Sequence, residues 1–126
     1  MSTKASRVTY TLILHLPARR SIRVGRLGNI TFEPGIYFYV GSGGRSPTSR
    51  LARHARKRKR KFWHIDYLTV HSDVIGAIIM ESGKSPECAL ATAMAEAFPL
   101  VEGFGSSDCR CRSHLFYGVP SRGGKT

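Results

Sequence analysis

The sequence predicts an α/β domain of the α+β type, in which a small mixed sheet is flanked by helices. Five segments are predicted as strands because they are rich in β-branched and aromatic residues or alternate polar and apolar ones: residues 8–16, 21–24, 35–41, 74–80 and 114–119. Two helices are predicted where a serine N-cap precedes a proline in the first turn, at Ser46-Pro47 and Ser85-Pro86.

The first three strands are bounded by residues that favour turns. Pro17 ends the segment 8–16, and the turn residues Gly25, Gly28 and Asn29 follow the segment 21–24. Side chains alternate between the two faces of a strand, so one face of residues 35–41 should carry Tyr37, Tyr39 and Gly41.

The first helix has two stripes of different character. Leu51 and Ala55 lie four residues apart and are expected to face the core. A second, basic stripe consists of Arg50, His54 and Lys57. Residues 62–70, which follow, fit either a helix or a strand, whereas the continuously apolar residues 74–80 predict a buried strand. The second helix should end before Pro99, and its apolar stripe consists of Leu90, Met94 and Ala97.

The length and composition suit one domain. The chain has 126 residues, of which 41% are hydrophobic, and shows no internal repeat or linker. We therefore expect a single domain over residues 1–126, with loose tails at residues 1–7 and 121–126. The three cysteines, an odd number, and a polar N-terminal segment argue against a secreted disulfide framework. These features predict a cytoplasmic protein with reduced thiols.

The charge balance is strongly basic. Twenty Lys and Arg residues oppose eight Asp and Glu residues, for a net charge of +12, which predicts attraction to polyanions. We expect Arg53, His64 and a run of six basic residues to contact nucleic acid, DNA in the first instance. The run consists of Arg56, Lys57, Arg58, Lys59, Arg60 and Lys61. A membrane partner is not expected, because membrane binding needs bulky apolar residues opposite the charges. Nothing in the sequence indicates a protein partner.

Five parts of the chain carry a resemblance to a known family. They are Tyr39-Val40-Gly41-Ser42, Arg50-Leu51-Ala52-Arg53-His54, Trp63-His64-Ile65-Asp66-Tyr67, Glu87 and residues 103–117. Together they resemble the GIY-YIG nuclease superfamily, in particular an uncharacterised prokaryotic branch whose members occur alone or fused to DNA-repair domains. The resemblance implies a central three-stranded antiparallel sheet flanked by helices. It also implies hydrolysis of DNA phosphodiester bonds with Mg²⁺ or Mn²⁺. The connection from Tyr10 to Tyr39 is longer than is usual in the family, and we expect it to hold an inserted hairpin around residues 21–30.

The same resemblance implies the site residues. Tyr39 matches the tyrosine of the YIG half, Arg50 the arginine of the next helix, and Glu87 the metal-binding glutamate. A literal Gly-Ile-Tyr occurs at residues 35–37, but it shares a predicted strand with Tyr39. Tyr10 is the better match for the other tyrosine, because the family's two tyrosines lie on neighbouring strands. We expect Tyr10, Tyr39, Arg50 and Glu87 to converge on one cleft.

Each of these residues also has an ordinary structural explanation. Arg50 can grip a phosphate with two donors, or it can be one more solvated arginine. Glu87 suits Mg²⁺ but equally complements the dipole of a helix N-terminus. Tyr10 or Tyr39 can orient or deprotonate an attacking water, or simply pack in a strand. As a base, a tyrosine needs positive surroundings that lower its pKa from about 10. His54 is a candidate for proton transfer, or a core or surface histidine.

A third group of residues has the chemistry of zinc ligands. Cys109, Cys111 and His114 form a Cys-x-Cys-x-x-His segment, and Cys88 or Asp108 could add a fourth ligand. The spacing is not the usual paired Cys-x-x-Cys of zinc knuckles, so a tight loop without metal is the favoured explanation.

Three functions remain open from the sequence. The first is a metal-dependent DNA endonuclease, with branched or damaged DNA in repair or recombination as one substrate class. The second is a non-catalytic nucleic-acid-binding module on the same fold, because Thr9 and Thr11 flank Tyr10 in place of the family's Gly and Ile. The third is a structural zinc protein with an RNA or ribosomal partner.

Overall fold

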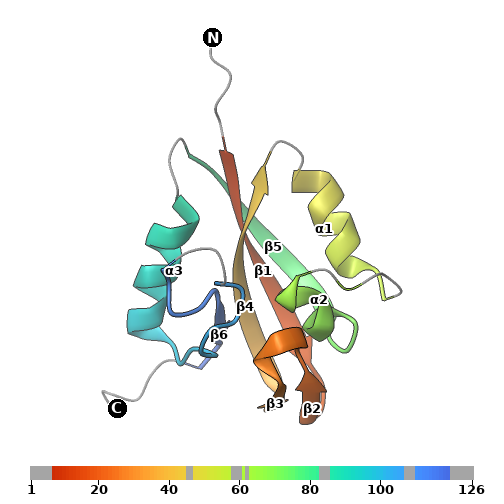
Figure 1. The fold of residues 1–126 in the computed structure, drawn as a ribbon. Helices are drawn as coiled ribbons and strands as arrows, with labels where there is room; N and C mark the ends of the chain where they lie inside the picture. The colour runs from red at the N-terminus through yellow and green to blue at the C-terminus, as the bar shows by residue number, and fades with distance from the viewer. Residues whose placement is uncertain are drawn as a thin grey trace.

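An antiparallel sheet with helices on both faces forms the centre of the molecule (Figure 1). The computed structural model describes residues 7–44, 47–57, 61, 63–82, 86–106 and 110–119. The strands lie in the order β5-β1-β4-β6, and each neighbouring pair is antiparallel. They are β1 (Arg7–Leu16), β4 (Gly35–Gly44), β5 (Asp73–Ser82) and β6 (Leu115–Tyr117). The α+β class is confirmed. The sheet has four strands rather than the expected three, because β6 adds a short strand beside β4.

The expected hairpin is present as a second, two-stranded sheet. It pairs β2 (Arg20–Arg23) with β3 (Asn29–Phe32), and a 3₁₀ turn, η1 (Gly25–Leu27), joins the two strands. Ile22 and Phe32 are buried and belong to the main core, so the hairpin packs on the domain rather than projecting from it.

Three helices flank the sheet: α1 (Pro47–Ala55), α2 (His64–Thr69) and α3 (Pro86–Ala97). The ambiguous residues 62–70 thus contain a short helix, α2, whose first turn is held by the Asp66 carboxylate. That carboxylate accepts a hydrogen bond from the Trp63 backbone N–H at 2.8 Å, which satisfies a donor that the helix itself leaves unpaired. None of the described helices is long and apolar enough to cross a membrane.

The two faces of the sheet have separate cores. On one face, the even-numbered leucines of β1 pack with the hairpin, α2 and Phe104. On the other face, Val40 and Phe116 pack against Ala91 and the neighbouring apolar residues of α3. Figure 1 shows the consequence, with α1 and α2 on one side of the strands and α3 on the other.

Three burial predictions were wrong. Residues 74–80 are not a buried strand: β5 lies at the sheet edge, paired with β1 alone, and Ile75 and Ile78 are more than half exposed. In α1, Ala55 is exposed and His54 faces the core instead, because its ring hydrogen-bonds to a buried tyrosine of β1. In α3, Ala97 is exposed, whereas Ala91 is the fully buried residue.

A buried carboxylate joins α1 to α2. Asp66 is 0% exposed, and its two oxygens accept hydrogen bonds from the Arg53 guanidinium at 2.7 and 2.9 Å. The same guanidinium lies over the Trp63 ring, 4.7 Å from the centroid. Such a bidentate pair fixes both position and orientation, so it sets where α1 and α2 lie relative to each other.

We predict that Asp66→Ala lowers the free energy of unfolding by about 3–5 kcal/mol, because it leaves the Arg53 charge without its buried partner. Glu102→Ala is the matched control. Glu102 pairs with Arg112 at 2.9 Å, but both side chains are about two-thirds exposed, and we expect a loss below about 1 kcal/mol. Urea unfolding of the two variants measures both values. Equal losses would contradict the role given to Asp66.

Candidate active site

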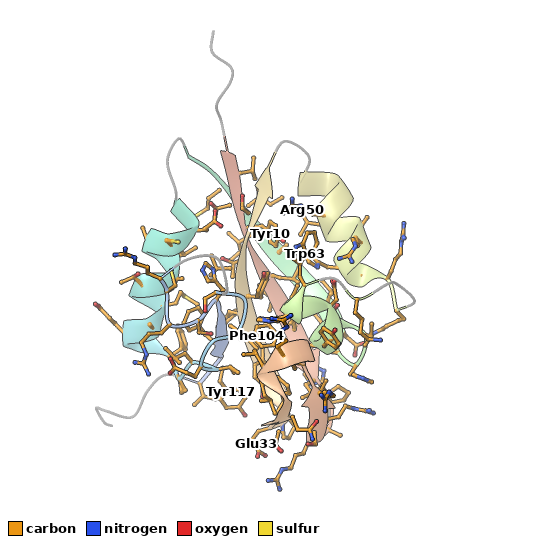
Figure 2. All side chains as sticks on the ribbon, in the orientation of Figure 1. Tyr10, Glu33, Arg50, Trp63, Phe104 and Tyr117 are labelled. Atoms are coloured by element: carbon orange, nitrogen blue, oxygen red, sulfur yellow. The ribbon has the colours of Figure 1, made fainter. Side chains whose placement is uncertain are left out.

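A cleft of about 380 Å³ opens where the end of β4 extends beyond β6, between α1 and α3. Its walls include four residues that the sequence predicted to converge: Tyr10 from β1, Tyr39 from β4, Arg50 from α1 and Glu87 from α3. Residues 40–42 of β4, Trp63 before α2, and Gly105 and His114 before β6 complete it. Figure 2 shows the labelled Tyr10, Arg50 and Trp63 gathered beside the strands. The predicted convergence is therefore present in the structure.

Tyr10 reaches the cleft because the residue opposite it is a glycine. The two residues are paired across β1 and β4, and a Cβ atom at Gly41 would lie only 2.6 Å from the Tyr10 ring. The ring thus lies directly on the backbone of β4. Its hydroxyl makes a 2.8 Å hydrogen bond with Nε2 of His54, and both side chains are almost completely buried. This bond ties α1 to the first strand of the sheet.

Tyr37, the tyrosine of the literal Gly-Ile-Tyr, lies elsewhere. Its hydroxyl donates to the carbonyl of Glu33 at 2.7 Å, at the opposite end of β4, and it does not line the cleft. Tyr10, on the neighbouring strand, accompanies Tyr39 in the cleft, as the sequence predicted.

The guanidinium of Arg50 is held in place from two sides. It donates from Nη1 to the carbonyl of Ser42 at 2.5 Å, and it lies over the Trp63 ring, 4.9 Å from the centroid. A planar cation fixed by a carbonyl and an aromatic face loses little freedom when it binds an anion. Arg50 is therefore ready to grip a phosphate without first being ordered.

Glu87 is the second residue of α3 and is only partly exposed. A carboxylate in a first turn complements the helix dipole, but this one also faces a cleft that contains an arginine. One carboxylate with room for water beside it matches the way Mg²⁺ binds to proteins. The donor set of the cleft thus fits a hard divalent cation.

Both cleft tyrosines are neutral at physiological pH. Burial raises the pKa of Tyr10 to about 12, although the nearby positive charge of Arg50 acts in the opposite direction. Burial also raises the pKa of Tyr39 above its ordinary value, and the neighbouring Tyr10 adds to this effect. The condition that a general base requires, a lowered pKa, is not met by either residue. Both hydroxyls keep their protons and can donate a hydrogen bond.

The residues expected to contact nucleic acid separate into two groups. Arg53 is held by Asp66, and His64 accepts a 2.8 Å hydrogen bond on Nδ1 from the Gly105 N–H, so both have partners inside the domain. Burial lowers the pKa of His64, which further favours the neutral ring. Of the basic run, Arg56, Lys57 and Lys61 are exposed, whereas Arg58, Lys59 and Arg60 lie outside the described residues. Lys57 also donates to the Ser72 carbonyl.

A second, basic hollow of about 520 Å³ lies beside the hairpin. Its lining includes the basic side chains of Arg20, Arg23 and Lys61 and the imidazole of His71. The pKa of His71 is lowered by burial and, in smaller part, by the positive charges of Arg20, Lys61 and Lys57. The sequence analysis missed this group because the hairpin and α2 bring it together from distant segments.

The predicted zinc segment is only partly visible. Cys109 and Asp108 lie outside the described residues, but Cys111 and His114 lie together with Cys88 at the start of α3. His114 also lines the cleft.

A family model described as a domain of unknown function, DUF123, matches residues 9–122. The chain belongs to the DUF123 family. No curated protein and no solved structure matches it. The matched residues include the whole cleft, so membership of DUF123 covers the site without assigning an activity to it.

Trp63 and Gly105 are site residues that the sequence analysis did not select. Trp63 supports Arg50, and Gly105 has a positive φ of 73° at a place where a Cβ atom would lie only 3.1 Å from the Tyr39 ring. Both lie in segments that carry the GIY-YIG resemblance, which is the one signal that pointed to them.

We predict that Gly41→Ala lowers the free energy of unfolding by about 1–3 kcal/mol, because the new methyl group must push the Tyr10 ring aside. Gly76→Ala in β5 is the control, since its Cβ would meet only one methyl group, at an ordinary 3.8 Å. Chemical unfolding compares the two. A Gly41 variant as stable as the Gly76 variant would contradict the close packing of Tyr10.

The raised pKa of Tyr10 predicts a loss of stability in alkali. The ordinary pKa is 10.0 and the folded value is about 12, so this stabilisation is complete below pH 10 and is lost as pH rises to about 12. Two pKa units correspond to about 2–3 kcal/mol. The tyrosinate absorbance of the native protein minus that of Tyr10→Phe isolates this group. A difference curve centred near pH 10 would contradict the burial argument.

Proposed function

We propose that this domain is a divalent-metal-dependent endonuclease that hydrolyses DNA phosphodiester bonds in the cleft. The observation that supports this most strongly is the meeting of Tyr10, Tyr39, Arg50 and Glu87 from four separate elements. Their combination agrees with the residues that the GIY-YIG resemblance implies. The proposal includes a cytoplasmic location, where the substrate is found, and structure-selective action in DNA repair or recombination.

Each residue has a defined part in the proposed reaction. Arg50, already oriented by Ser42 and Trp63, binds the scissile phosphate and stabilises the negative charge that develops on it. Glu87 would hold Mg²⁺ or Mn²⁺, which when bound supplies Lewis acidity and a more acidic water. The hydroxyls of Tyr10 and Tyr39 hold the attacking water by hydrogen bonds. His54 fixes the Tyr10 hydroxyl and is the group placed to exchange a proton with it.

The test is cleavage of supercoiled, linear, nicked, flapped and branched DNA with Mg²⁺, with Mn²⁺ and with a chelator. We predict that Arg50→Ala and Glu87→Gln each lower the single-turnover rate by about 10²–10³-fold, the effect of removing one electrostatic contact from a transition state. Arg19→Ala is the matched control, because it removes one exposed positive charge far from the cleft. Full activity of either cleft variant would contradict the proposed site.

The basic hollow beside the hairpin supports a second candidate, a non-catalytic nucleic-acid-binding module. Arg20, Arg23 and Lys61 form a cationic surface separate from the cleft, and neither cleft tyrosine has the pKa of a base. This function predicts that the protein binds DNA in a salt-dependent way but cleaves none of the tested DNA substrates with either Mg²⁺ or Mn²⁺.

In both cases DNA binding should depend on salt. We predict that replacing Arg20, Arg23 and Lys61 together by alanine makes the slope of log K against log salt concentration shallower by about 2–3, because each lost phosphate contact removes about 0.9 from it. Fluorescence anisotropy with a labelled duplex measures the slope. The cleavage rate of this variant at saturating DNA should change little. An unchanged slope would show that this surface does not contact DNA.

A further inference from the structure

Two cysteines and a histidine from distant parts of the chain lie together beside the cleft. Cys88 is in the first turn of α3, whereas Cys111 and His114 lie in the segment that leads into β6. Their ligand atoms, the two Sγ atoms and a ring nitrogen, all lie within 4.8 Å of one another. This cluster shares no member with the Arg50 and Glu87 pair.

His114 is oriented as a metal-binding histidine commonly is. The ring is 4% exposed, and its Nδ1 lies 3.0 Å from the carbonyl oxygen of Val40. A carbonyl can only accept, so Nδ1 donates, and the neutral ring carries its lone pair on Nε2. A backbone carbonyl that fixes the tautomer and orientation in this way is the usual outer-shell partner of a histidine ligand.

We propose that Cys88, Cys111 and His114 bind a zinc ion. Two thiolates and an imidazole are soft and borderline ligands, which favour zinc over the Mg²⁺ suited to the Glu87 carboxylate. Zinc–sulfur bonds of about 2.3 Å and zinc–nitrogen bonds of about 2.0–2.1 Å place tetrahedral ligand atoms about 3.5–3.8 Å apart. Separations below 4.8 Å therefore need only small side-chain movements to close on an ion.

The position of the cluster gives the ion a definite structural effect. Cys88 immediately follows Glu87, and His114 lines the same cleft as Glu87. Zinc would fasten the first turn of α3 to the segment before β6 and so hold the Glu87 backbone against the sheet. Three protein ligands leave a fourth coordination position, which water can fill. The proposal stands whether or not the cleft cleaves DNA.

The test uses the full chain without an affinity tag, stripped with a chelator and then titrated with zinc. We expect one zinc per chain, and a Co²⁺-substituted form with thiolate-to-metal charge-transfer absorption and the intense visible bands of tetrahedral coordination. Loss of an outer-shell partner typically weakens metal binding by about 10–100-fold. Cys88→Ser and Cys111→Ser each remove a ligand and should weaken zinc binding by more than this. His71→Ala is the control, because it removes an exposed histidine that lines the separate basic hollow, and it should bind zinc like the native chain.

Zinc should also raise the melting temperature of the native chain and of His71→Ala, but not that of Cys88→Ser, because an ion that binds only the folded state stabilises it. Melting of the metal-free proteins shows whether Cys88→Ser is itself folded. The assignment is overturned if the native chain binds no zinc, if a folded Cys88→Ser binds it as tightly as the native chain, or if His71→Ala loses it.

Discussion

The packing of the Tyr10 ring on the backbone of Gly41 is the contact on which the cleft depends. A side chain of any size at position 41 would occupy the space of that ring, with its Cβ only 2.6 Å away. Because the ring lies there, its hydroxyl reaches Nε2 of His54 and fixes α1 against β1. Arg50, one helical turn before His54, is thereby brought over the end of β4, where the Ser42 carbonyl receives it. The position of Arg50 thus depends on the absence of a side chain at Gly41, which lies opposite Tyr10 on β4.

Burial, rather than net charge, decides the chemistry of the cleft. The chain carries a net charge of +12, which alone would favour ionised tyrosines, yet the pKa of Tyr10 is raised to about 12. Loss of hydration destabilises the phenolate oxygen directly and so raises the tyrosine pKa, whereas solvent screens the opposing effect of distant positive charges. Deprotonation of water therefore cannot be assigned to these tyrosines, and in the proposed reaction a bound cation beside Glu87 supplies a more acidic water. Arg50 is left to stabilise the phosphate.

Local pattern predicted most elements of the fold and several residues of the site. Strand propensity located β1 and β4, the Ser-Pro pairs located α1 and α3, and the resemblance around Gly41 pointed to Tyr10 and Arg50. Burial and side-chain clusters that depend on which elements pack together could not be predicted from the sequence. The apolar run of β5 indicated burial, but its edge position leaves Ile75 exposed. The cluster of Cys88 with Cys111 likewise exists only because α3 begins beside the segment before β6, which no spacing along the chain reveals.

The proposed function requires that the cleft between α1 and α3 bind a divalent cation next to a phosphate of DNA. Crystals of the protein with a short DNA duplex and Mn²⁺ test it directly, because manganese is located by its anomalous scattering. We predict a manganese peak at the Glu87 carboxylate, with a DNA phosphate between that peak and the Arg50 guanidinium. DNA bound only at the Arg20, Arg23 and Lys61 surface, with no manganese at Glu87, would contradict it.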